Sequence, residues 1–282
     1  MEWIDRLNDA MRYIETHLDQ EISLDQLAKI ACCSPYHFQR MFAYIADVPL
    51  SEYIRRRRMS LAAVDLRSGG DKIVDIALKY GYSSPTAFNR AFQSVHGVAP
   101  SAVRKDSAPL KSFPPIQFHV TVSGGQALEY RIEEHPAFRA IGLLAPLSTK
   151  IEENFSVVPG LWGRAAEEGM IPRLLSMMDG VPKGLLGVSA CMGEDSWHYM
   201  IGVASSMPAD APFESLDVGA YTWAVFSGSG SSHSIQDLEK RVVLEWLPTS
   251  GYEYADGPDI EVYLNADPQN AHYEVWIPVT KK

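Results

Sequence analysis

Two nine-residue stretches of the chain share five residues at the same places. The stretches are SPYHFQRMF, starting at Ser34, and SPTAFNRAF, starting at Ser84. In a helix, three polar residues of each stretch would lie on one face at positions i, i+3 and i+4. They are Tyr36, Gln39 and Arg40 in the first stretch and Thr86, Asn89 and Arg90 in the second. Because Arg pairs with guanine, and Gln or Asn with adenine, in the major groove, both faces are predicted to read DNA.

A second chemical candidate is a carboxylate among aromatic side chains. In DIEVYLN, Glu261 and Tyr263 alternate with apolar residues, so they share one face of a predicted strand. Aromatic residues of neighbouring predicted strands are Trp197, Tyr199, Trp223, Tyr273 and Trp276. A partly desolvated carboxylate beside aromatic rings suits a lipophilic cation, with cation–π contacts worth roughly 0.5–2 kcal/mol each. The alternation also fits a half-exposed strand whose polar face is solvated and whose tryptophans are core.

Each DNA-reading stretch needs a preceding helix, a turn and a helix start. Apolar residues at helical spacing precede both stretches: Leu24, Leu27 and Ala28, then Ile73, Ile76 and Ala77. In each stretch the Ser-Pro pair is typical of a helix start, with Ser as N-cap and Pro in the first helical position. Two helix-turn-helix units are therefore predicted. The alternative is a helical domain whose repeat is purely architectural and whose polar faces are solvated.

A long helix is predicted between the two units, in PLSEYIRRRRMSLAAVDLRSGG. At about 1.5 Å per residue, about 17 residues span roughly 25 Å, which would hold the reading helices on successive turns of one DNA face. This helix contains four consecutive arginines, which cannot all face one way. We expect Arg55 and Arg57 to meet phosphates and the other two to cap helices or pair with acids.

The charge of the chain is uneven. Its 282 residues carry a net charge of −10. Residues 1–108 hold 14 Lys and Arg against 13 Asp and Glu, whereas the remainder holds 11 against 22. Within the first part, residues 51–108 hold 10 basic against 5 acidic side chains, which makes a local basic patch. The overall acidity therefore does not exclude DNA binding.

The first residues lack the features of a signal peptide, and no apolar run reaches the roughly 20 residues that cross a bilayer. We expect a cytoplasmic protein without a membrane partner.

The three cysteines, Cys32, Cys33 and Cys191, have no CxxC spacing. We expect them to be reduced and mostly buried, with neither a metal site nor a cofactor.

A proline-containing connection runs from Lys105 to Gly125. The sequence before it has a helical pattern, and the sequence after it has short apolar strands that alternate with two helical segments. We expect an all-α double helix-turn-helix domain at residues 1–108, a linker at 109–126 and an α+β domain at 127–282. In the last, the order strand, helix, strand, strand occurs twice. Two such repeats side by side would leave a pseudo-twofold cleft between them.

The first part resembles the double helix-turn-helix domain of the AraC/XylS family of bacterial transcription regulators. The resemblance covers about residues 1–105 and includes the closing pattern G-x-x-P-S-x-x-R, from Gly97 to Arg104. It implies that the six polar residues named above read bases in two adjacent major grooves of double-stranded DNA, and it leaves RNA polymerase as a possible further partner. The N-terminal placement resembles the Rob branch. One departure is Cys32, where many relatives have glycine in the first turn.

The second part resembles the gyrase-inhibitor-like (GyrI-like) domain, which also forms the effector-binding half of regulators such as BmrR. The resemblance is carried by AYTWAVFSGSG, VVLEWLPTSGYEY and GPDIEVYL. It implies that Glu261 is the buried acid that meets cationic, hydrophobic ligands, with Tyr263, Trp223 and Trp162 as further ligand-binding candidates.

The sequence thus predicts a transcription regulator that reads DNA and senses an amphipathic cation, and that has no catalytic residues. One alternative is that the second domain is a hydrolase of reactive small molecules in which Glu261 acts as general acid or base. Another is that it is a docking surface for a protein, without a ligand.

Overall fold

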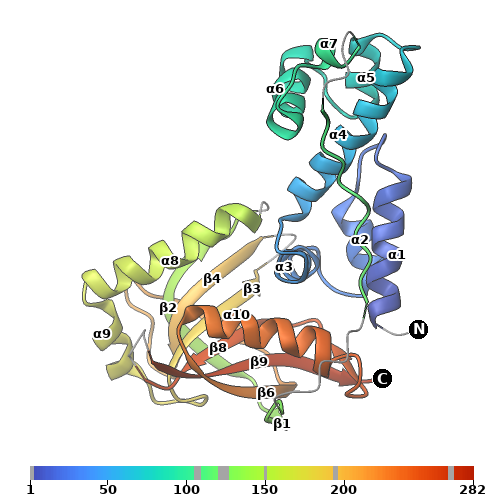
Figure 1. Cartoon of the computed structure of the whole chain (residues 1–282). Helices are drawn as coiled ribbons and strands as arrows, with labels where there is room; N and C mark the ends of the chain where they lie inside the picture. The colour runs from blue at the N-terminus through green and yellow to red at the C-terminus, as the bar shows by residue number, and fades with distance from the viewer. Residues whose placement is uncertain (1–2, 105–108, 120–126, 149–150, 193–195, 266–269) are drawn as a thin grey trace. The chain divides into compact units, whose positions relative to one another are not determined.

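The computed structural model describes residues 3–104, 109–119, 127–148, 151–192, 196–265 and 270–282. The chain forms two compact units, Met1–His119 and Val120–Lys282 (Figure 1). The first is helical, and the second is a mixed α/β unit with a large antiparallel sheet. No described helix has the length and apolar character that a membrane span requires.

The described part of the first unit has seven helices, and all but the first and the last fall at the predicted places. They are α1 (Trp3–Thr16), α2 (Leu24–Ala31), α3 (Pro35–Ala46), α4 (Leu50–Ser68), α5 (Ile73–Lys79), α6 (Pro85–His96) and α7 (Pro100–Val103). The predicted N-caps are confirmed, since Ser34 Oγ accepts from the His37 N–H at 3.2 Å and Ser84 Oγ from the Ala87 N–H at 3.4 Å. Short turns join α2 to α3 and α5 to α6, and α4 lies between the two helix pairs.

Residues 109–119 correct the predicted boundary. They were expected in a linker, but they belong to the first unit, where their backbone is hydrogen-bonded to its helices. The N–H of Phe113 donates to Ser60 Oγ at 3.1 Å, and the N–H of Phe118 donates to Asn8 Oδ1 at 2.8 Å. The rest of the predicted linker, 120–126, lies outside the described residues.

Nine strands of one sheet are described in the second unit. They are β1 (Tyr130–His135), β2 (Phe138–Pro146), β3 (Leu185–Cys191), β4 (Trp197–Ala204), β5 (Glu214–Val218), β6 (Tyr221–Gly230), β7 (Tyr252–Tyr254), β8 (Asp259–Tyr263) and β9 (Ala271–Lys281). Their order is β1-β6-β9-β8-β3-β4-β2-β5, and β7 pairs with β9. The helical segments are α8 (Ile151–Glu167), α9 (Met170–Met177), α10 (Ser232–Arg241) and a π-helix, η1 (Val242–Trp246).

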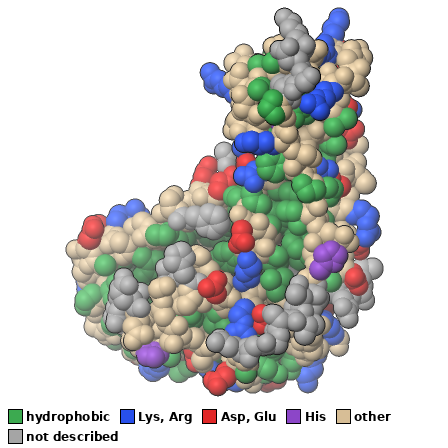
Figure 2. Space-filling view, in the orientation of Figure 1, with side chains coloured by type: hydrophobic (Ala, Val, Ile, Leu, Met, Phe, Trp, Pro, Cys, Tyr) green, Lys and Arg blue, Asp and Glu red, His purple; other side chains and the backbone are tan. Residues whose placement is uncertain are grey.

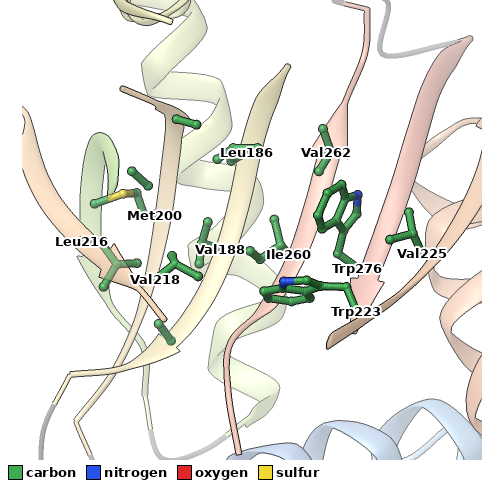
Figure 3. Close-up of a cluster of buried hydrophobic side chains, with 13 residues drawn as sticks. Leu186, Val188, Met200, Leu216, Val218, Trp223, Val225, Ile260, Val262 and Trp276 are labelled. Carbon is green, nitrogen blue, oxygen red and sulfur yellow. The ribbon is translucent and has the colours of Figure 1, made fainter. Parts of the chain in front are cut away.

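One face of the sheet carries an apolar cluster from many strands, shown in Figure 3. From β8 it takes Ile260 and Val262, so alternation turns Glu261 and Tyr263 to the opposite face. Helices α8 and α10 cover that opposite face: α8 reaches Tyr199 of β4 and α10 reaches Tyr273 of β9. The sheet thus separates this apolar cluster from the face that holds Glu261.

Trp223 lies in the apolar cluster and is fully buried (Figure 3). Its ring contacts that of Trp276, with centroids 5.8 Å apart. Trp223 is therefore a core residue on the other side of the sheet from Glu261, which corrects its prediction as a ligand contact.

Candidate functional site

The predicted reading face of α6 is exposed. Thr86 and Arg90 are exposed and Asn89 is half-buried, whereas Phe88 and Phe92 of the same helix are fully buried. The exposed fractions follow helical spacing, because three and four residues bring a side chain back to the same face. Figure 2 shows Lys and Arg side chains around the end of the first unit that holds α5, α6 and α7. This surface has the polar and cationic character that a DNA groove requires.

The equivalent face of α3 differs. Tyr36, Gln39 and Arg40 are each 8% exposed. Arg40 Nε donates to the Tyr44 hydroxyl at 3.2 Å, and its guanidinium lies over the Tyr44 ring, 5.4 Å from the centroid. Gln39 Nε2 lies 3.5 Å from the Pro35 carbonyl. The two predicted faces therefore match in residue type but not in exposure.

The arginine run of α4 is engaged within the first unit. Arg55 bonds Glu52 and the hydroxyl of Ser94, and Arg56 bonds the same Glu52 carboxylate at 2.6 Å. Burial works against the charge of Glu52, but these hydrogen bonds hold its pKa below the usual value. Arg58 donates to two carbonyls of the loop before α2.

Arg57 was predicted to meet DNA phosphates, and its surroundings argue against that role. It is 8% exposed, and two of its nitrogens bond the Glu15 carboxylate at 2.6–3.0 Å. A third donates to the Phe113 carbonyl at 2.6 Å. Pulling a buried arginine out of such a pair leaves an uncompensated carboxylate, so this side chain is structural.

In the second unit, Glu261 is the acceptor of a tyrosine network. Its Oε2 accepts from the hydroxyl of Tyr263 at 2.9 Å and from that of Tyr199 at 3.2 Å. Trp162 of α8 closes the group, since its Nε1 donates to the Tyr199 hydroxyl at 3.1 Å. Its ring also meets the Tyr263 ring edge to face, with centroids 5.0 Å apart. The structure thus brings together three of the four predicted ligand residues and adds Tyr199, one of the aromatic candidates of the neighbouring strands.

A glycine makes room for this network. Gly187 of β3 pairs with Glu261 across the sheet. A Cβ at this position would overlap the Tyr199 hydroxyl and come within 3.0 Å of Glu261 Oε2. The Tyr199 ring can therefore lean over β3 to reach the acid. This role of Gly187 could not be predicted from the sequence, because it depends on which strand lies beside β8.

The electrostatics of the network favour a bound positive charge. Burial, followed by the charge of Glu261, raises the pKa of Tyr263 far above its usual value. Tyr263 therefore keeps its proton and donates it to the carboxylate as a hydrogen bond. A half-buried carboxylate flanked by aromatic rings attracts an organic cation through charge and through the ring faces.

The described residues hold no group of three or more His, Cys, Asp or Glu side chains that could bind a metal ion. Two cysteines depart from the expectation of burial, since Cys32 and Cys191 are exposed.

Two protein families match the chain. The GyrI-like small molecule binding domain matches residues 128–280, and a helix-turn-helix domain matches residues 27–106. The regulatory protein SoxS of Escherichia coli is 39% identical over 98 residues, which cover 35% of this chain and 92% of SoxS. The transcriptional regulator Rob of Salmonella typhimurium is 41% identical over 101 residues, which cover 36% of this chain and only 35% of Rob. Among solved structures, SAV2435 bound to tetraphenylphosphonium has a TM-score of 0.48 and 21% identity, covering 54% of this chain and 94% of that one.

Proposed function

The chain belongs to the AraC/XylS-type transcription regulators in the Rob-like arrangement, with a C-terminal GyrI-like small molecule binding domain, and we propose that it couples sequence-specific DNA binding to the sensing of an amphipathic cation. The observation that carries the sensing half is the Glu261 carboxylate, which accepts hydrogen bonds from two tyrosines beside Trp162. The DNA-binding half rests on the polar face of α6.

Two helix-turn-helix motifs make up the proposed DNA reader. The first is α2 with α3 and the second is α5 with α6, and each second helix begins with a Ser N-cap followed by Pro. In the second motif, Arg90 and Asn89 are the base readers. In the first, Arg40 and Gln39 take the same role by sequence equivalence. Of the two arginines of α4 that were predicted to meet phosphates, Arg55 is kept as the proposed contact, because its side chain is one-third exposed whereas Arg57 is buried.

The sensor is proposed to be an internal duplication. The strand order supports it, because β1, β6, β9 and β8 on one side of the sheet centre stand where β5, β2, β4 and β3 stand on the other. Each side also contributes one helix, α8 or α10, to the face that holds Glu261. A ligand placed over Glu261 would then lie between two related halves.

The proposed ligand is a lipophilic cation of the kind that tetraphenylphosphonium represents. A delocalised cation loses little hydration on entering an aromatic site, and the carboxylate compensates its charge. The regulator is proposed to act in the bacterial cytoplasm, where its promoter DNA and RNA polymerase, a further proposed partner, are found.

The test is a tryptophan-fluorescence titration with tetraphenylphosphonium on the full chain. Trp162 lies within hydrogen-bond distance of Tyr199 and in ring contact with Tyr263, so a ligand over Glu261 should quench it. Glu261→Gln keeps the shape and removes the charge, and we expect it to weaken binding by at least about tenfold, since one unit charge in such a site is worth about 1.4 kcal/mol or more. Glu253→Gln, at a half-buried acid of β7, is the control and should bind as wild type.

Two results would contradict the sensor. A wild-type protein that does not respond to any of a panel of lipophilic cations would favour a protein-docking domain. Consumption of the added compound, measured by mass spectrometry, would favour a hydrolase.

A further inference from the structure

The segment 109–118, which we call the brace, runs along the first unit from its second helix pair to its first (Figure 1). At its beginning, the N–H of Lys111 donates to Nδ1 of His96 at 3.3 Å, at the end of α6. Leu110 and Phe113 pack against the apolar core that α4, α5 and α6 share. This end of the brace is therefore attached to the half of the unit that contains the second reading helix.

The other end of the brace is attached to the first half. Phe118 and Asn8 of α1 exchange two hydrogen bonds, of 2.8 and 2.9 Å. The Phe118 side chain is 7% exposed and its ring meets that of Phe42 of α3 edge to face, at 6.1 Å. One continuous chain segment thus reaches from α6 to the core beside α3.

Between its ends the brace is fastened to α4 at a buried node. Arg57 binds Glu15 of α1 with two nitrogens and the Phe113 carbonyl with a third. Tyr53 donates to the same Glu15 at 2.6 Å and accepts from the N–H of Ile116 at 3.1 Å. Charge-assisted hydrogen bonds are directional, so the node fixes the mutual positions of α1, α4 and the brace.

This attachment matters because α4 is a long helix, and a small bend in it displaces one helix pair relative to the other. Its 19 residues span about 28 Å, so a bend of about 20° at its middle would move one end by about 5 Å relative to its position in a straight helix. One base pair of DNA advances by only about 3.4 Å. A helix without support would therefore tolerate half-sites whose spacing differs by a base pair.

We propose that the brace positions the two reading helices and so sets the half-site spacing that the protein accepts. The proposal rests on the function proposed above, with two reading helices. Asn8, Ser60, Glu15 and Arg57 are positioning residues in this account, because they act on DNA reading through the brace.

The test first selects a preferred site from random DNA with the full-length wild-type protein. A second site carries one extra base pair between the two half-sites, which shifts one half-site by about 3.4 Å and rotates it by about 34°. The wild type should bind the longer site at least about tenfold more weakly, as for other faults in a specific site. In Asn8→Ala/Ser60→Ala, which removes the brace contacts of both side chains, that ratio should fall below about threefold. The neighbouring change Asp9→Ala breaks only an exposed ion pair with Arg12 and should keep the wild-type ratio.

If the double variant discriminates between the two sites as strongly as the wild type does, the brace proposal is wrong. If the double variant does not fold, the same two affinities are measured for the single variant Asn8→Ala. An unselective wild type, with no preferred site at all, would instead contradict the proposed DNA reader. A brace that served only stability would lower the melting temperature of the double variant and leave the ratio unchanged.

Discussion

Arg90 is the residue on which the base-reading proposal for α6 depends most. It is exposed, and it shares its face with Thr86 and Asn89. Its guanidinium presents a planar fork of donors that matches guanine O6 and N7, whereas a lysine offers a single ammonium group on a flexible stem.

We predict that Arg90→Ala weakens binding to the selected site by about 1–3 kcal/mol and relaxes specificity at one base pair. Arg90→Lys should recover only the non-specific part, because it keeps the charge and loses the planar fork. Affinities for the selected site and for random DNA, measured at one salt concentration, check this. Equal losses on both DNAs in Arg90→Ala would mean that the residue meets a phosphate.

At the level of single residues, the sequence predicted which side chains carry the chemistry of a site better than it predicted which residues surround them. Glu261 and Tyr263 were predicted to share a face, and their hydrogen bond shows that they do. Arg57 could not be assigned from sequence, since its carboxylate partner lies 42 residues away on α1. The prediction that Trp223 contacts the ligand was wrong for a related reason. Its strand was predicted, but the face of the sheet on which its side chain lies depends on the pairing with β9.

At the scale of elements, the turns of the two helix pairs provide a matched comparison. Cys32, after α2, and Gly81, after α5, both have left-handed backbones, with φ of 54° and 83°. Only glycine adopts this conformation without strain, which costs other residues roughly 1–2 kcal/mol. The first turn therefore already carries a strain that the second avoids.

We predict that Gly81→Ala lowers the free energy of unfolding by about 1 kcal/mol, because a side chain at positive φ is strained and its Cβ would lie 3.2 Å from Arg58 Nη1. Cys32→Ala keeps the same strain and should change stability by less than about 0.5 kcal/mol. Urea denaturation followed by far-ultraviolet circular dichroism measures both. A neutral Gly81→Ala would show that the turn can relax to another backbone.

The elements that the sequence did not predict are mostly at sheet edges or helix ends. β1 and β5 are the two edge strands, and their sequences, YRIEEH and ESLDV, are largely polar. An edge strand has one hydrogen-bonded neighbour and a half-exposed surface, so its sequence carries a weak apolar signal. The helix of the second predicted strand-helix-strand-strand repeat lies in SIQDLEKRVVLEWL. It exists as α10 followed by η1, a change of hydrogen bonding that apolar spacing does not reveal.

At the scale of the whole molecule, the chain joins two units of different charge and different chemistry. The acidic excess lies in residues 109–282, which contain the ligand unit, and this leaves the first unit free to offer a basic surface to DNA. Both units were predictable as separate domains, because their sequence periods differ. The attachment of 109–119 to the first unit was not, since prolines in this segment are equally typical of a linker.

The proposed function requires that a cation at Glu261 changes the affinity of the chain for DNA, so the ligand must bind differently to two states of the protein. The most direct measurement is the affinity of the full chain for its selected DNA site with and without saturating tetraphenylphosphonium, in wild type and in Glu261→Gln. We predict a change in DNA affinity of about 5- to 150-fold in the wild type and an equal change in cation affinity when DNA is bound. In Glu261→Gln the change should be much smaller at a cation concentration that only just saturates the wild type. A wild type that binds the cation, as measured by fluorescence, and binds the DNA with unchanged affinity would show that the two sites are not coupled.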